Sequence, residues 1–176
     1  IAKSLQRKLE APGALDNVPF ADNKIRLLEI LINKTCPLIN IKLNELTKKF
    51  PTLNANIMGA IRNDKFIILK KNDVMLEEDK VYVIISAPQM QETLNAFGHN
   101  EKISNKILII GGGNIGFNLA KNIEESFDSA RVKIIEKNKE RAEFIANELN
   151  DTIVINGNGL EEEVLLESNL DEAETV

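Results

Sequence analysis

The sequence predicts an α/β protein in which a small β-α-β-β-β-α module precedes the first half of a parallel, doubly wound sheet. An apolar run at residues 107–110 leads into the glycine cluster Gly111-x-Gly113-x-x-Gly116, and apolar residues at helical spacing follow. Two more short apolar runs, 132–135 and 153–155, flank a second helical segment. Strand, glycine turn, helix, strand, helix and strand is the first half of a Rossmann-like domain.

The glycine cluster fits a dinucleotide-binding turn. Gly111 would permit the tight bend, Gly113 would let the backbone approach a pyrophosphate, and Gly116 would allow close packing of the helix on the strand. The helix would begin near Asn114 and Ile115, so that its unpaired N–H groups point at the phosphate. The alternative is an ordinary strand-to-helix turn, but the flanking strand and helix favour nucleotide binding.

An acidic residue stands where a ribose-binding carboxylate is expected. The run 132–135 ends in Glu136, twenty residues beyond Gly116, and such an acid accepts hydrogen bonds from ribose hydroxyls. A 2′-phosphate would meet a like charge there, which favours NAD(H) or an adenine nucleotide over NADP(H). Lys137 or Lys139 could still accommodate that phosphate, and Glu136 alone could also be a solvated residue at a strand end.

The first hundred residues predict shorter elements separated by turns. Residues 1–11 are predicted to be helical, 13–21 to contain a short extended piece, and 22–33 to form a helix capped by Asp22, with a strand as the alternative. We then expect strands at 37–43, 54–62, 65–70 and 80–86, and helices at 43–50 and 88–97. The turn Asn63-Asp64 would join the second and third of these strands.

Composition and charge limit the classes of function. The chain has 176 residues, is 43% hydrophobic and has one cysteine, Cys36, which excludes an internal disulfide and a site with several cysteine ligands. No run of eighteen apolar residues and no leader is present, so neither a membrane span nor export is predicted. The sequence has no basic patch with interleaved aromatic residues, so nucleic-acid binding is not predicted.

An uneven distribution of charge predicts a boundary between two domains. Residues 1–105 carry 15 Lys and Arg against 12 Asp and Glu, whereas residues 106–176 carry 7 against 15. The polar stretch 99–105 lies at this change and is predicted to be a linker. His99, the only histidine, would be a solvated residue in it.

The stretches "ILIIGGGNIGFNLAK", "VKIIEKNKERAEFIANEL" and "IRNDKFIILKKNDVMLEEDKVYVIIS" resemble the TrkA family. Its members are cytosolic nucleotide-binding regulatory subunits of Trk bacterial potassium-uptake systems, built from RCK (KTN) domains. The resemblance implies four segments: 1–35, the end of a Rossmann-like N-subdomain; 36–98, an RCK C-subdomain; 99–105, a linker; and 106–176, a second, truncated N-subdomain.

The resemblance also implies a ligand, a site and partners. The cofactor would be NAD(H) or ATP/ADP, and its candidate contacts are Gly111, Gly113, Asn114, Ile115, Gly116, Glu136, Lys137 and Asn158; no catalytic or metal-binding residue is implied. Asn158 follows Gly157 where the family usually has Asp. The protein would be cytoplasmic, would associate with itself through RCK domains, and would gate a membrane potassium-transport subunit at the inner face of the membrane.

Two other functions stay open at the level of sequence. An NAD-dependent oxidoreductase would need an acid or base near the nicotinamide, and His99 and Tyr82 are poor candidates because one lies in the linker and the other in a predicted core strand. Alternatively, the C-subdomain alone could sense a metabolite.

The doubly wound topology makes a prediction about the strand at residues 107–110. In the strand order 3-2-1-4, a fourth strand would pair with the first, but only Thr175 and Val176 remain for it. One edge of the first strand would therefore be largely uncovered, which favours association. We accordingly expect a fragment of a longer chain, or an edge covered by another copy.

Overall fold

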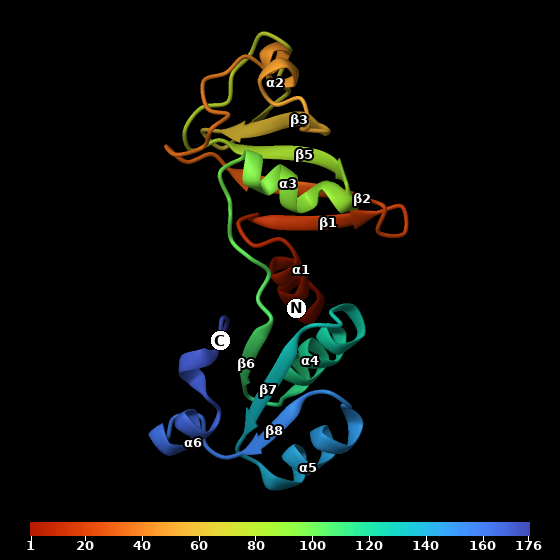
Figure 1. Ribbon diagram of the computed structural model, residues 1–176, viewed down its shortest axis with the longest axis vertical. Helices are drawn as coiled ribbons and strands as arrows, with labels where there is room; N and C mark the ends of the chain where they lie inside the picture. The colour runs from red at the N-terminus through yellow and green to blue at the C-terminus, as the bar shows by residue number, and fades with distance from the viewer. The chain divides into compact units, whose positions relative to one another are not determined.

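The computed structural model describes residues 1–176, which form two compact units. One unit is Glu10–Lys102, and the other comprises Ile103–Val176 together with the N-terminal segment Ile1–Leu9. Figure 1 labels most of the helices and strands of both units. None of the helices combines the length and the apolar character that a membrane crossing would need.

The unit Glu10–Lys102 is built on a five-stranded antiparallel sheet with the order β1-β2-β5-β3-β4. Its strands are β1 (Asp16–Phe20), β2 (Ile25–Leu31), β3 (Ala55–Arg62), β4 (Lys65–Ile67) and β5 (Lys80–Ser86). Alternate residues of β5 are buried, which is the pattern of a sheet with one face on the core. The predicted turn Asn63-Asp64 joins β3 to β4, and both its residues have positive φ.

Helices α2 (Leu43–Lys49) and α3 (Met90–Ala96), the latter preceded by the 3-10 turn η1 (Ala87–Gln89), complete this unit. Its core contains buried side chains from the sheet, from both helices and from the segment before α2, including Leu28, Val83, Leu46, Leu94 and Leu38. The predictions of α2, β3, β5 and the helix opened by Pro88 are confirmed, whereas β4 ends earlier than predicted.

The structure corrects the helix predicted at residues 22–33: residues 25–31 form strand β2, which confirms the alternative that the sequence left open. Its residues pair with β1 on one side and β5 on the other, so hydrogen bonds to two neighbours replace those that a helix would make within itself. Asp22 lies with Ala21 and Asn23 in the turn before β2, and all three have positive φ. Strands β1 and β2 thus belong to the same compact unit as residues 36–98.

Two further predictions in this unit were wrong. The segment 37–43 is not a strand but a series of turns with a single bridge, Lys42 to Val74; its apolar residue Leu38 is fully buried in a turn. His99 is not a solvated linker residue, because only 12% of its side chain is exposed and it lies against Gly13.

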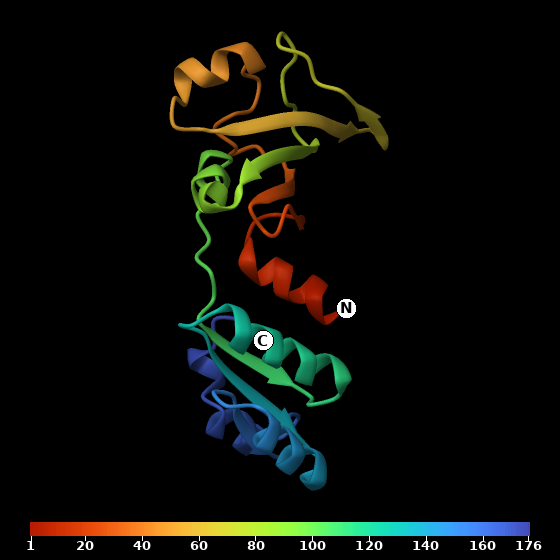
Figure 2. The ribbon, with the colours of Figure 1, turned by 90° about the vertical axis from the view of Figure 1, so that its right-hand side faces the viewer.

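The second unit contains a three-stranded parallel sheet with the order β6-β7-β8. Its strands are β6 (Lys106–Ile110), β7 (Arg131–Glu136) and β8 (Ile153–Asn156), connected by α4 (Asn114–Ser126) and α5 (Lys139–Glu148). Figure 2 shows α4 lying along this sheet. After β8, α6 (Glu162–Glu167) and the 3-10 turn η2 (Leu170–Glu172) lead back to the free side of β6.

A fourth strand position is present beside β6, as the predicted order 3-2-1-4 requires. Thr175 forms a parallel bridge with Ile107, and the Leu108 N–H donates to the Thr175 carbonyl at 2.9 Å. Beyond this contact β6 has no neighbouring strand on that side.

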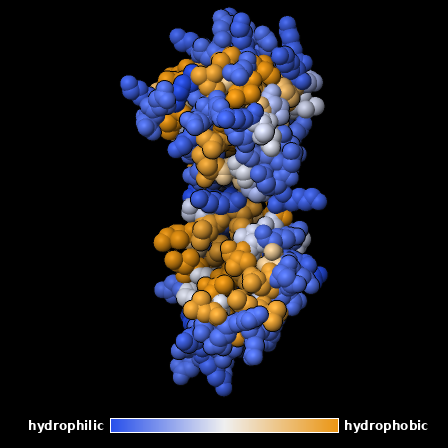
Figure 3. Space-filling view, turned by 90° about the vertical axis from the view of Figure 1, so that its left-hand side faces the viewer, coloured by the Kyte–Doolittle hydropathy of each residue, from blue (hydrophilic) through white to orange (hydrophobic).

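The core of this unit lies between the sheet, α4 and α5, and α1 (Ala2–Glu10) adds Leu9 to it. Gln6 of α1 also donates to the Ser126 hydroxyl at 2.9 Å. On the β6 side, the surface of the unit is largely hydrophobic (Figure 3). The exposed apolar side chains of the unit include Leu5, Ile110, Ile115, Leu160, Leu166 and Val176.

Candidate functional site

The glycine turn between β6 and α4 has the bend and the packing that its sequence predicts. Gly111 has φ +104°, a conformation that glycine adopts readily and other residues rarely do. A Cβ on Gly116 would collide with the Gly111 carbonyl oxygen and lie 3.1 Å from Cγ2 of Ile109. The predicted roles of these two glycines in the bend and in close helix packing are therefore confirmed.

Glu136, at the end of β7, holds the glycine turn in place. One carboxylate oxygen accepts the Gly112 N–H at 2.7 Å, and the other accepts the Asn138 N–H at 2.8 Å. Gly112 is buried, and a Cβ there would collide with Cδ1 of Ile145. The acid predicted from its distance to Gly116 thus lies directly against the turn, and it is not merely a solvated residue at a strand end.

The N-terminus of α4 is open toward solvent. Gly113 is its N-cap, no side chain caps the helix, and a Cβ on Gly113 would meet no atom within 4 Å. The first N–H groups of a helix have no partner inside it, so those of Asn114 and Ile115 are available to a ligand. A cavity of about 460 Å³ adjoins this turn and is lined by Gly111, Gly113, Asn114, Ile115, Gly116, Ile109, Ile110, Leu119 and Leu5. The geometry can accept an anion at the helix end.

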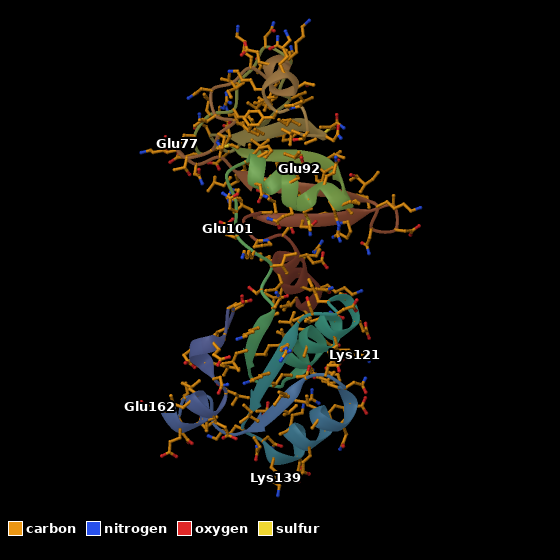
Figure 4. All side chains as sticks on the ribbon, in the orientation of Figure 1. Glu77, Glu92, Glu101, Lys121, Lys139 and Glu162 are labelled. Atoms are coloured by element: carbon orange, nitrogen blue, oxygen red, sulfur yellow. The ribbon has the colours of Figure 1, made fainter.

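The remaining predicted residues lie at the same edge of the sheet, but they make other contacts. Lys137 is exposed beyond the end of β7, and Lys139 extends into solvent from α5 (Figure 4), 78% exposed and 3.9 Å from Glu143. Asn158 closes the turn after β8, where its amide donates to the Glu161 carboxylate at 3.1 Å.

Three residues that the sequence did not single out organise this edge. The Asn156 amide donates to the carbonyls of Glu136 and Lys137, at 2.9 and 3.2 Å, and so holds the loop after β7. Arg141 and Gly112 form a second contact, in which the arginine Nε donates to the glycine carbonyl at 2.8 Å. The run of three consecutive glycines could have indicated Gly112, but no local sequence pattern marks Asn156 or Arg141.

Both parts of the chain match known domain families. The TrkA-C domain model matches residues 27–98, and the TrkA-N domain model matches residues 107–176.

Curated relatives align with this chain over 99–100% of its length. The Trk system potassium uptake protein TrkA of Azorhizobium caulinodans is 35% identical over 176 residues, which are 100% of this chain and 38% of that protein. The protein of the same name from Vibrio alginolyticus is 30% identical over 174 residues, or 99% of this chain and 37% of that protein. The chain therefore spans less than two fifths of the length of these relatives.

Solved structures show the same fold at lower identity. The crystal structure of the GsuK RCK domain has a TM-score of 0.52 and 18% identity, and the match covers 96% of this chain and 36% of that one. The GsuK channel bound to NAD also has a TM-score of 0.52 and 18% identity, with 96% of this chain and 30% of that one covered. The two domain matches, which together span most of the chain, and the alignments to TrkA proteins, which cover 99–100% of this chain, lead to one conclusion: the chain belongs to the TrkA family.

Proposed function

We propose that this chain is a nucleotide-binding regulatory part of a Trk-type potassium-uptake system. The observation that carries the proposal is the open N-terminus of α4 beside the Glu136 carboxylate. The names of the relatives and of the NAD-bound GsuK channel support the same assignment.

The residues at this edge fit an adenine dinucleotide. The pyrophosphate would accept hydrogen bonds from the free N–H groups of Gly113, Asn114 and Ile115. Gly113 has no side chain and no atom lies within 4 Å of where its Cβ would be, so the pyrophosphate has room there. Glu136 accepts only one backbone N–H on each oxygen, and a carboxylate offers about four acceptor positions. The remaining positions would accept the hydroxyls of the adenosine ribose.

NAD(H) is the ligand we favour, with ATP or ADP as the alternatives. All three share the adenosine and phosphate groups that the glycine turn and Glu136 would recognise. A 2′-phosphate would approach the Glu136 charge, whereas Lys139 extends into solvent next to Glu143. NADP(H) should accordingly bind more weakly than NAD(H).

The regulatory part of the proposal requires no chemistry at the site. A bound nucleotide shifts a conformational equilibrium only through different affinities for two states, and those states would open or close a potassium-translocating membrane protein. In this proposal the chain is cytoplasmic, lies at the inner face of the membrane through that partner, and associates with further RCK domains. An oxidoreductase, which would need an acid or base near the nicotinamide, is less well supported, because the unit with the glycine turn contains no histidine and no tyrosine of its own.

Calorimetric titration of the full-length protein with NAD, NADH, ATP, ADP and NADP tests the ligand. Replacing Gly113 by Ala should leave the melting temperature unchanged, because φ is −63° and no atom lies within 4 Å of the new Cβ. The same change should weaken nucleotide binding by filling the phosphate position.

Glu136→Gln should weaken NAD binding by about 1–3 kcal/mol, the cost of losing a charged hydrogen-bond partner. Glu140→Gln is the matched control, since it removes the same charge from an exposed residue nearby on α5. Unchanged affinity in both site variants would contradict the nucleotide site, and turnover of NADH with a substrate would contradict the regulatory assignment.

A further inference from the structure

Arg141, in the first turn of α5, is held against the glycine turn by three contacts. Its Nε donates to the Gly112 carbonyl at 2.8 Å. Its guanidinium carbon lies 5.3 Å from the ring centroid of Phe117 on α4 and 4.9 Å from that of Phe144 on α5. Both distances are within the range of a cation–π contact, so the arginine head is fixed between the two helices.

The peptide between Gly112 and Gly113 is therefore restrained from the protein side. Arg141 binds its carbonyl, while Glu136 binds the N–H of the preceding peptide, at Gly112. In a trans peptide the carbonyl and the N–H point in opposite directions, and the chain has no cis peptide bond. With the Gly112 carbonyl directed at Arg141, the Gly113 N–H must point away from Arg141.

Gly113 itself lies on the open side of the turn. It is exposed to solvent, no atom lies within 4 Å of the position of a Cβ on it, and the uncapped first turn of α4 begins at the next residue. A glycine peptide without such a restraint rotates easily, because glycine has few steric limits on its dihedral angles.

We propose that Arg141 is a positioning residue for the phosphate group of a bound nucleotide. By holding the Gly112 carbonyl, it keeps the Gly113 N–H directed at the place where a pyrophosphate oxygen accepts it. Arg141 acts on the ligand through this peptide and not by contact of its charge with the phosphate. The effect on binding rests on the proposed function, whereas the orientation of the peptide does not.

The test uses Arg141→Met in the full-length protein. Methionine keeps an apolar stem between the two phenylalanines but removes the Nε donor and the charge. Arg131→Met is the matched control, because Arg131 is exposed at the opposite end of β7 from Glu136. Binding of NAD, which has a pyrophosphate, is compared by calorimetry with binding of adenosine, which has none, followed by NMR titration.

The expected result is selective. Arg141→Met should weaken the binding of NAD on the order of tenfold, the effect of losing one charge-assisted hydrogen bond. The affinity for adenosine should stay within about twofold of the wild-type value. The ratio of wild-type to variant affinity for NAD should be the same at low and high salt. Arg131→Met should change neither ligand. The positioning role would be overturned if both ligands bound equally more weakly, or if NAD bound as tightly as to the wild type. It would also be overturned if the loss of NAD affinity disappeared at high salt, because salt screens a direct charge contact.

A measurement without nucleotide separates this inference from the proposed function. In the ligand-free protein, NMR of labelled glycine should show a changed Gly112 carbonyl shift and a changed Gly113 amide shift in Arg141→Met, and neither change in Arg131→Met. If the wild-type protein binds no nucleotide, the proposed function fails, and these shifts alone decide the orientation of the peptide. Unchanged glycine shifts would overturn it.

Discussion

The ion pair between Asp79 and Arg62 is expected to be a major source of stability for the unit Glu10–Lys102. Asp79 is 1% exposed and accepts three hydrogen bonds, from Arg62 Nε at 2.8 Å, from Arg62 Nη2 at 2.7 Å and from the Leu76 N–H at 2.8 Å. Replacing Asp79 by Ala would leave the arginine and the N–H group without their partner. Breaking a buried pair in this way costs roughly 3–5 kcal/mol.

The lower end of that range applies here. Arg62 is 29% exposed and also donates to the Val74 carbonyl at 3.0 Å, so water can reach the freed guanidinium. We therefore expect Asp79→Ala to lower the free energy of unfolding by about 3 kcal/mol. For a unit of this size, that corresponds to a fall in melting temperature on the order of 10–20 °C.

The single tyrosine provides a specific probe for this measurement. Tyr82 lies in β5 of the same unit, and the chain has no tryptophan, so tyrosine fluorescence during urea unfolding reports on Glu10–Lys102. Glu77→Gln is the control, because Glu77 (Figure 4) is 44% exposed and lies 3.7 Å from Lys34 in a surface pair. Such pairs contribute about 0–1 kcal/mol.

A double variant makes the reasoning refutable. Removing both partners, in Arg62→Met with Asp79→Ala, should cost less than the sum of the two single changes, because neither charge is then left without its partner. The pair would not be a stabilising unit if Asp79→Ala lowered the free energy of unfolding no more than Glu77→Gln does. The same conclusion would follow if the loss in the double variant equalled the sum of the two single losses.

Three further predictions concern acidity and reactivity. Burial raises the pKa of Asp79, but the hydrogen bonds from Arg62 and from the Leu76 N–H outweigh it and hold the pKa below its usual range. The stabilisation is thus complete above the unfolded pKa of about 4 and is lost as the pH falls through the folded pKa. The urea concentration at the unfolding midpoint should therefore decrease as the pH is lowered below about 4, and it should decrease less steeply in Asp79→Asn. Burial likewise raises the pKa of Glu124, yet hydrogen bonds from residues 150–152 lower it overall. Because Glu124 accepts the N–H groups of Asp151 and Thr152 at 2.9 and 2.6 Å, Glu124→Gln should speed the hydrogen exchange of those two amides on the order of tenfold. Unchanged exchange rates would contradict this prediction. Burial also raises the pKa of the Cys36 thiol, which is 2% exposed, so a thiol reagent should label it only after unfolding, and rapid labelling of the native protein would refute its burial.

The sequence by itself determined the parallel half of the fold and the centre of its candidate site. The bend at Gly111 and the close approach at Gly116 depend on the absence of a side chain, a requirement that a sequence displays directly. The apolar runs at 107–110 and 132–135 lead into a glycine turn and an acid, and in the structure this acid, Glu136, accepts a hydrogen bond from the turn. Even the position of Thr175 beside β6 followed from the rules of doubly wound sheets.

Only the tertiary structure decided the elements that depend on distant partners. Residues 25–31 are apolar on more than one face, and pairing with both β1 and β5 made them a strand. Leu38 is buried as deeply in a turn as it would be in the predicted strand, so hydrophobicity alone could not distinguish the two.

The contact of Arg141 with Gly112 likewise joins residues 29 positions apart. It forms because α4 and α5 pack on the same parallel sheet and bring Phe117 and Phe144 to a centroid distance of 5.7 Å around the arginine. Local sequence rules report what one segment can adopt on its own, whereas a contact of this kind exists only after separate segments have packed together.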